Sequence, residues 1–434
     1  MLNNQNIFNK KKILVYGLGK SGLSAFKFLN KNNEIYLFDD KKIIDHNHQI
    51  KKSLISYQKL LRKNIDQIII SPGIDIKKCS LKNYLKKNSK KIYTDLDIFY
   101  DFYTKNKKIT ITGTNGKSTT ARLVYEVLRD QNFDARIVGN IGNPILSEKN
   151  ITSKTVFVIE ASSYQLEYSK LFKSNISVIL NISPDHLERH KTLKNYVKAK
   201  FKIVKNQTKK DYAILNMNNL YIKNEVKIQK FFPKLIKVYK YLDIKFLKNI
   251  NNPYFYSQSN RENVSFIFEI TKILKIKKIN LFKTLKNFKG LKYRQQIIFR
   301  SKKLTIINDS KSTSFSSSAS ILKLMANVSW IVGGLAKKGD KFLLQKKDCI
   351  NVKAYIYGKN RNTFISELKK IVKYETFTNL KLLIKKVFLD IKRNESLKHK
   401  TILFSPAAAS FDSFKNFEER GKYFNNLIKK NNNV

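Results

Sequence analysis

Residues 110–120, TITGTNGKSTT, constrain the fold of this chain more than any other segment. They lie between an apolar run typical of a β-strand and an apolar helical pattern, ARLVYEVLRD. They carry the Gly-Lys-Ser end of a phosphate loop, although Ile111 stands where the strict pattern G-x-x-x-x-G-K-S/T begins and Gly113 replaces that glycine two positions later. In such a loop backbone N–H groups surround the phosphates, Lys117 reaches the terminal phosphates and Ser118 ligates Mg²⁺. The segment therefore predicts an α/β domain that binds a nucleoside triphosphate.

A second glycine pattern, G-x-G-x-x-G, occupies residues 17–22 directly after the apolar run KKILVY. Asp39 and Asp40 end the next apolar run. Glycines at this spacing let the backbone approach a pyrophosphate at a helix N-terminus, where free N–H groups and the macrodipole favour negative charge. The pattern suits a dinucleotide, another phosphorylated ligand or simply a tight strand–helix turn. We favour the second of these.

Short apolar runs alternate with helical patterns along the chain, which at 434 residues has room for about three domains. The first series holds ILVYG, EIYLFDD and QIIISPGI, and a basic stretch at residues 105–108 precedes the second series, ITITG, VFVIEASS, ISVILNIS and DYAILN. A helical stretch at 266–288 closes the second series, and LTIINDS, SWIVGG, AYIYG and TILFSPAAAS form the third. We therefore expect three α/β domains, spanning 1–104, 105–292 and 293–434.

The composition excludes several classes of protein. The 86 Lys and Arg residues against 32 Asp and Glu residues give a net charge of +54, but 42% of residues are hydrophobic, which excludes a disordered basic tail. Lysines recur in every stretch, so we interpret them as solvated charges and expect no specific nucleic-acid partner. Cys79 and Cys349 lie too far apart in sequence to form a disulfide framework or a cysteine-rich zinc site. Without a signal-peptide pattern or an apolar run of about 18 residues, we expect a cytoplasmic enzyme with no membrane span.

Three polar side chains follow or lie near predicted strands of the second series. Glu160 ends the run TVFVIE, where its carboxylate could hold Mg²⁺ beside the phosphate loop or could merely cap the next helix. His186 follows the run ISVILNIS and a proline turn, and taken alone such a histidine is more often structural. Lys200 lies in a helical pattern and taken alone looks like one more solvated charge.

Motifs in order along nearly the whole chain resemble those of the muramyl ligases of peptidoglycan synthesis, most closely the members that add glutamate. Besides GTNGKST these motifs are GLGKSGLS, SPGI at 71–74, VGNIGNP at 138–144, EASSYQLE at 160–167, NISPDHLERH at 181–190, NDSKST at 308–313 and SPAAASFDSFKNFEERG at 405–421. The resemblance is weakest between about 220 and 285. It implies a Rossmann-like UDP-binding domain, a central phosphate-loop ATPase domain and a Rossmann-like C-terminal domain.

The resemblance also implies an activity. The carboxylate of UDP-MurNAc-L-alanine would attack the γ-phosphate of ATP, and the amine of D-glutamate would then displace phosphate from the acyl phosphate to form an amide. Two Mg²⁺ ions would assist, and the family's matching lysine, here Lys200, carries a CO₂-derived carbamate that supplies an anionic oxygen to the second ion. We expect small-molecule substrates only and a monomer.

The site residues that the resemblance implies fall into five groups. The catalytic group is Lys117, His186 and Lys200. The ATP group is Gly113, Thr114, Asn115, Gly116, Lys117, Ser118, Thr119, Asn260, Asn263, Arg294 and Asp309. The UDP-substrate group is Gly17, Gly19, Ser21, Gly22, Asp39, Asp40, Ser71, Gly73, Asn140 and Ser162. The D-glutamate group is Thr313, Lys337, Ser410 and Phe417. The metal group is Ser118, Glu160, His186 and the carbamylated Lys200.

Some residues differ from the family's pattern, and two alternative functions stay open. Tyr293 and Ser259 stand where histidines are usual, and Lys20 and Lys41 differ from the commoner residues beside the UDP site. The nearest alternative is another muramyl ligase with a different amino acid, although the DNPR signature of the diaminopimelate-adding members is absent. A nicotinamide-dependent dehydrogenase built on residues 17–22 leaves the second phosphate loop unexplained.

Overall fold

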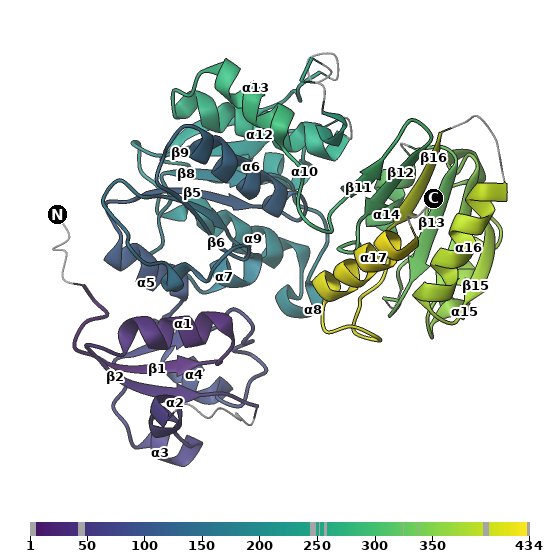
Figure 1. Cartoon of the computed structure of the whole chain (residues 1–434). Coiled ribbons are helices and arrows are strands. Elements are labelled where there is room, and N and C mark those ends of the chain that lie inside the picture. The colour runs from purple at the N-terminus through teal and green to yellow at the C-terminus, as the bar shows by residue number, and fades with distance from the viewer. Residues whose placement is uncertain are drawn as a thin grey trace. The chain divides into compact units, whose positions relative to one another are not determined.

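The computed structural model describes residues 6–41, 48–243, 249–250, 252–255, 258–323, 325–337, 339–393 and 399–431. The chain divides into two compact units, Met1–Asn287 and Phe288–Val434 (Figure 1). In the described residues the first unit contains two β-sheets and the second unit contains one. None of the helices in these ranges is both long and apolar enough to cross a lipid bilayer.

The first sheet has four parallel strands in the order β2-β1-β3-β4. The strands are β1 (Lys12–Tyr16), β2 (Glu34–Phe38), β3 (Gln67–Ile70) and β4 (Ile92–Tyr93), and the helices are α1 (Lys20–Leu29), α2 (His48–Ser53), α3 (Tyr57–Leu61), α4 (Lys82–Lys87), η1 (Ser89–Lys91) and α5 (Asp95–Phe102). β3 is buried along its whole length, as expected for a parallel strand that is covered on both faces. The strand order reverses between β1 and β3, and a ligand crevice is expected where such a reversal occurs.

The second sheet has six parallel strands in the order β10-β9-β8-β5-β7-β6. The strands are β5 (Lys107–Thr112), β6 (Ala135–Gly139), β7 (Val156–Glu160), β8 (Ile176–Ile179), β9 (Tyr212–Asn216) and β10 (Lys234–Val238). The helices are α6 (Lys117–Asp130), η2 (Ile145–Ser147), α7 (Ser163–Glu167), α8 (Leu187–His190), α9 (Leu193–Lys205), α10 (Leu220–Ile228), η3 (Pro253–Phe255), α12 (Gln258–Ile273) and α13 (Lys278–Asn287). The order reverses at β5, so the loop after β5 opens at the expected position of a ligand crevice.

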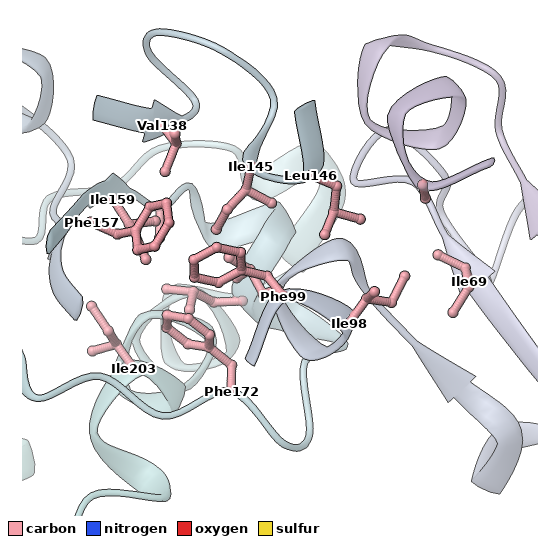
Figure 2. Close-up of a cluster of buried hydrophobic side chains, with 14 of the residues drawn as sticks. Ile69, Ile98, Phe99, Val138, Ile145, Leu146, Phe157, Ile159, Phe172 and Ile203 are labelled. Carbon is pink, nitrogen blue, oxygen red and sulfur yellow. The ribbon is translucent and has the colours of Figure 1, made fainter. Parts of the chain in front are cut away.

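One buried core links the two sheets of the first unit, and Figure 2 shows part of it. Ile69 of β3 belongs to this core together with Ile98 and Phe99 of α5. The ring of Phe99 meets the ring of Phe157 from β7 edge to face, with centroids 4.7 Å apart. Helix α5 therefore joins the sheet that precedes it to the sheet that follows it.

The second unit has a six-stranded sheet in the order β11-β12-β16-β13-β14-β15, in which only β11 is antiparallel to its neighbour. The strands are β11 (Gln296–Arg300), β12 (Leu304–Asn308), β13 (Val328–Gly333), β14 (Val352–Tyr357), β15 (Lys373–Phe377) and β16 (Lys400–Phe404), and the helices are α14 (Phe315–Leu322), η4 (Lys346–Asp348), α15 (Arg361–Leu368), α16 (Leu380–Arg393) and α17 (Phe417–Asn431). Trp330 is fully buried in its core, and its indole N–H donates to the carbonyl of Ser405 at 2.8 Å.

The prediction of three α/β sheets with mainly parallel strands is confirmed, whereas some elements were missed. The helical stretch expected at 266–288 is two helices, because the chain turns at Lys275, which has a φ of +57°. Five strands were not predicted, namely β4, β6, β10, β11 and β15. β4 is missed because it has only two residues, and β10 and β15 are missed because they are edge strands with alternating or polar sequences. The division between the two units lies at Asn287 and Phe288, and the domain limits 104/105 and 292/293 stay predictions.

Candidate active site

A cavity of about 830 Å³ opens in the first unit between the loops that follow β1 and β3 and the loops of the second sheet. Predicted UDP-substrate residues on its wall are Gly17, Gly19, Ser21, Asp39, Ser71, Gly73, Asn140 and Ser162. The three predicted catalytic residues, Lys117, His186 and Lys200, lie on the same wall. The structure therefore brings together two groups of residues that are far apart in sequence, whereas Gly22, Asp40, Glu160 and Ser118 do not line the cavity.

The phosphate loop holds two lysines around one carbonyl. Lys117 is the first residue of α6, and its ammonium donates to the carbonyls of Gly113 at 2.9 Å and Thr114 at 2.8 Å. The ammonium of Lys200, from α9, donates to the same Gly113 carbonyl at 2.7 Å. Both side-chain nitrogens thus lie at the N-terminus of α6, where the free N–H groups of the first helical turn favour an anion.

Gly116 shapes the start of α6. It has a φ of +82°, and an added Cβ would lie 2.2 Å from the side-chain oxygen of Asn263. Asn263 comes from α12, as does Asn260, which donates to the carbonyl of Tyr254 at 2.7 Å. Two predicted ATP residues that follow Gly116 by more than a hundred positions therefore lie on the helix that packs against the phosphate-loop helix.

Asn181 fixes the phosphate loop to the end of β8. Its carbonyl accepts from the N–H of Thr114 and its side-chain oxygen from the N–H of Asn115, both at 2.8 Å. The hydroxyl of Thr114 lies 3.1 Å from that of Tyr196, a buried residue of α9 that also lines the cavity. Neither Asn181 nor Tyr196 was among the predicted site residues, although Asn181 begins the NISPDHLERH motif.

Glu160 combines burial with an unused oxygen. It ends β7 next to β5 and is 1% exposed. One carboxylate oxygen accepts from the side-chain amide of Asn140 at 2.8 Å, whereas the other is buried without a hydrogen-bond partner among the described residues. A buried anionic oxygen without a partner is costly, so this position suits a cation such as Mg²⁺.

Lys200 is a buried lysine on the cavity wall. It is 1% exposed, and its ammonium lies 4.6 Å from the centroid of the Tyr196 ring. Burial lowers the pKa of Lys200 well below its ordinary value, and the charge of Lys117 lowers it further, while Asp185 and Glu160 act in the opposite direction. A lysine in these surroundings is more easily a neutral, nucleophilic amine than an exposed one.

His186 precedes α8 in the left-handed region, with a φ of +53°. Its ring lies 4.9 Å from that of Tyr164, and its nitrogens are 3.5 Å from a carboxylate oxygen of Asp185 and 3.4 Å from one of Glu188. In the described part of the chain, no three His, Cys, Asp or Glu side chains gather to hold a metal by themselves. A metal here would therefore take further ligands from water or from the phosphates of a nucleotide, which is the usual arrangement for Mg²⁺.

The loops of the first sheet form the opposite wall. An added Cβ on Gly22 would lie 1.9 Å from the carbonyl oxygen of Gly17, so the third glycine of the pattern permits close packing of α1 on the turn. Ser71 donates to that same carbonyl. Asp39 accepts from the N–H of Leu18 at 2.6 Å, whereas Asp40 accepts from the hydroxyl of Tyr16 at 2.7 Å and does not line the cavity.

In the second unit, Asp309 is buried at the end of β12. Burial raises the pKa of Asp309 to about 7, against opposing hydrogen bonds from the Ser405 hydroxyl at 2.9 Å and the Gln295 N–H at 3.0 Å. The charge of Arg294 acts in the same direction as these hydrogen bonds. Two predicted nucleotide residues, Arg294 and Asp309, therefore lie close enough to interact.

The predicted D-glutamate residues differ in exposure. Thr313 and Lys337 are exposed, Ser410 is buried and Phe417 is half-buried. The ammonium of Lys311 lies 4.2 Å from the centroid of the Phe417 ring.

Arg420 is a fully buried residue that sequence reasoning missed. It donates to the Ser310 carbonyl at 2.7 Å and the Ala408 carbonyl at 2.9 Å, and so joins α17 to the loops after β12 and β16. Its place in the motif SPAAASFDSFKNFEERG was the signal available in the sequence.

Known proteins match this chain along its length. The family model of the Mur ligase middle domain matches residues 111–284, and that of the Mur ligase MurD-like N-terminal domain matches residues 11–92. The chain is 31% identical over 442 residues to UDP-N-acetylmuramoylalanine–D-glutamate ligase of Rickettsia bellii, covering 96% of this chain and 97% of that protein. It is 33% identical over 431 residues to the ligase of the same name from Hydrogenobaculum, covering 97% and 99%.

A solved structure supports the fold independently. The UDP-N-acetylmuramate–alanine ligase of Thermotoga maritima superposes with a TM-score of 0.57 at 17% identity, covering 97% of this chain and 100% of that one. The chain therefore belongs to the Mur ligase family, whose members use ATP to form amide bonds. Within that family, the relatives matched over nearly full length are the D-glutamate-adding ligases, and the resemblance seen in the sequence is confirmed.

Proposed function

We propose that this chain joins D-glutamate to UDP-MurNAc-L-alanine, with cleavage of ATP to ADP and phosphate. The reaction belongs to the synthesis of peptidoglycan precursors in the cytoplasm, and the enzyme acts as a monomer. The observation that carries this proposal is the shared cavity, in which the glycine turn of the first sheet faces Lys117, His186 and Lys200. A UDP-linked acid bound along the first wall would present its carboxylate beside the terminal phosphate of ATP.

The chemistry requires neutralisation of charge. A carboxylate and a triphosphate repel each other, so Lys117 and the N-terminus of α6 stabilise the transferring phosphoryl group as the substrate oxygen attacks in line. ADP leaves and an acyl phosphate forms. The amine of D-glutamate then attacks the acyl carbon, phosphate leaves with the acyl–oxygen electron pair, and the amine loses a proton. No protein nucleophile is needed.

The residues present fit Mg²⁺. Glu160 supplies a buried anionic oxygen, Ser118 follows Lys117 in the first turn of α6 and is 4% exposed, and His186 lies on the cavity wall. Bound Mg²⁺ would neutralise phosphate charge and polarise the phosphoryl group.

We infer that Lys200 carries a carbamate. The neutral amine adds to the carbon of CO₂ and loses a proton, which replaces a cation with an anionic oxygen ligand. Its burial beside Lys117 and near Glu160 supports this inference, because an added negative charge there offsets Lys117 and would help to hold a second ion.

In this proposal the second unit provides the residues that bind D-glutamate and the part of the nucleotide farthest from the reacting phosphate. Lys337 is exposed and can pair with a carboxylate of D-glutamate. Arg294 and Asp309 lie near each other and suit the nucleotide.

The deciding experiment measures phosphate release from ATP by the purified chain with Mg²⁺. Release is expected only when UDP-MurNAc-L-alanine and D-glutamate are both present, together with a product whose mass has increased by one glutamyl residue. A panel of L-alanine, L-glutamate, diaminopimelate and D-alanyl-D-alanine tests the alternative of another muramyl ligase. Release with any of these in place of D-glutamate contradicts the assigned specificity.

A further inference from the structure

Arg189 lies outside the cavity wall but touches three segments that build it. It belongs to α8, three residues after His186, and its side chain is 7% exposed. Its guanidinium donates to the carbonyl of Ile74 at 2.6 Å and to a carboxylate oxygen of Glu167 at 2.9 Å. No residue group given above for catalysis, substrate or metal includes it.

Each partner of Arg189 belongs to a different part of the wall. Ile74 lines the cavity and closes the turn that begins at Ser71, since its N–H donates to the Ser71 carbonyl at 3.0 Å. Glu167 is the last residue of α7, and residues 162–165 at the start of that helix line the cavity. α8 itself begins directly after His186. One side chain therefore connects the UDP-substrate turn, α7 and the His186 loop.

Two aromatic rings hold the guanidinium in place. Its central carbon lies 5.2 Å from the ring centroid of Tyr164 and 5.5 Å from that of Tyr168. Tyr164 lines the cavity and also packs against the ring of His186 at 4.9 Å. The position of Arg189 is thus transmitted to His186 through a ring contact as well as through the short helix.

This geometry requires arginine. A planar guanidinium can donate to two acceptors in different directions while its faces pack on aromatic rings, whereas an ammonium is a compact, strongly hydrated charge on a flexible stem. Lysine at position 189 would keep the charge beside Glu167 but could not reproduce the fork that also holds the Ile74 carbonyl.

We infer that Arg189 is a positioning residue that holds the turn of residues 71–74 in register with His186 and Lys117, so that the bound UDP-linked acid meets the terminal phosphate of ATP. This inference rests on the proposed function. Because residues 71–74 line the cavity, a small shift of this turn removes contacts to the bound UDP-linked acid and weakens its binding.

The test compares R189K with the wild-type enzyme in phosphate-release assays. We expect the KM for UDP-MurNAc-L-alanine to rise about tenfold or more, while the Kd for ATP in the absence of the UDP substrate stays within about twofold. A purely structural role would lower the fraction of active enzyme and reduce kcat while leaving both constants unchanged. R122K is the matched control, because Arg122 pairs with Glu126 at a partly exposed position of α6 and does not line the cavity.

A second variant decides the matter if R189K does not fold. E167Q keeps the arginine and its bond to Ile74 but removes the charged partner, so we expect a smaller rise in the same KM. An unchanged KM for the UDP substrate in a folded variant, or an equal loss of affinity for ATP and the UDP substrate, overturns the inference. Failure of the wild-type enzyme to release phosphate with both substrates would instead overturn the proposed function.

Discussion

Two buried lysines lie near opposite ends of strand β5. Lys108 belongs to the strand and Lys200 to helix α9, and each is 1% exposed, yet their surroundings differ. Lys108, in β5, donates to the carbonyls of Tyr103 and Asn106 and lies over the rings of Phe99 and Tyr100. Lys200 lies beyond the other end of β5, on the cavity wall. Burial lowers the pKa of both lysines. A buried, perturbed lysine is therefore not by itself evidence of function; access to a cavity that also holds other charges is what distinguishes Lys200.

The largest expected effect comes from K117A. Loss of this cation removes charge stabilisation from the transferring phosphoryl group, so we expect kcat to fall by about a thousandfold. The Kd for the UDP substrate, measured by calorimetry without ATP, should stay within about threefold. A comparable loss of affinity for the UDP substrate would show that Lys117 serves both walls of the cavity.

The next effect separates Lys200 from a neighbouring lysine. K200R keeps a positive charge but cannot form a carbamate, and we expect activity to fall by about a hundredfold or more. K198R is the control, since Lys198 is exposed on the same helix and should leave activity unchanged. Mass spectrometry under added bicarbonate should detect a gain of one CO₂ in the wild-type enzyme only. Full activity of K200R would refute the carbamate.

Lys337 extends the comparison to an exposed lysine. K337A removes the proposed partner of a D-glutamate carboxylate, and we expect the KM for D-glutamate to rise about tenfold, with less change in the KM for ATP. Steady-state kinetics with each substrate varied in turn provide the measurement. Equal effects on the two constants would reject the assignment.

The sequence predicted the sheets and the phosphate loop because both depend on local pattern. Buried strands such as QIII are short apolar runs, and Gly113 to Thr119 is a contiguous motif. The burial of Lys200 could not be deduced in this way, because it depends on α9 packing beside a loop 87 positions away. The family resemblance, and not the residue pattern, identified that lysine.

Contacts between distant segments account for what was missed. Three of the missed residues form hydrogen bonds with backbone groups of other loops, namely Arg189, Asn181 and Arg420. A sequence does not show which backbone group a side chain will reach. Asp40 illustrates the opposite case. It follows Asp39 directly, but its carboxylate accepts from the Tyr16 hydroxyl and does not line the cavity.

The smallest expected effect on activity is that of Lys108, whose burial instead predicts a pH dependence of stability. Burial lowers the pKa of Lys108 from 10.5 to about 7, with a smaller contribution from the charge of Lys173. Between these values the unfolded chain binds more protons than the folded chain, so stability rises with pH and is lost as pH falls through about 7. K108M removes this titration. The difference in unfolding free energy between wild type and K108M should therefore shift in favour of wild type by at most about 1.4 kcal/mol per pH unit between about pH 7 and 10.

Urea unfolding of both proteins at several pH values between about 7 and 9 measures this slope, while kcat of K108M should match wild type because Lys108 does not line the cavity. A difference in stability that does not change with pH would mean that Lys108 stays charged in the folded protein. In that case the two carbonyls and two rings around it would compensate for its burial more fully than the surroundings of Lys200 do, and the contrast between the two lysines would be sharper still.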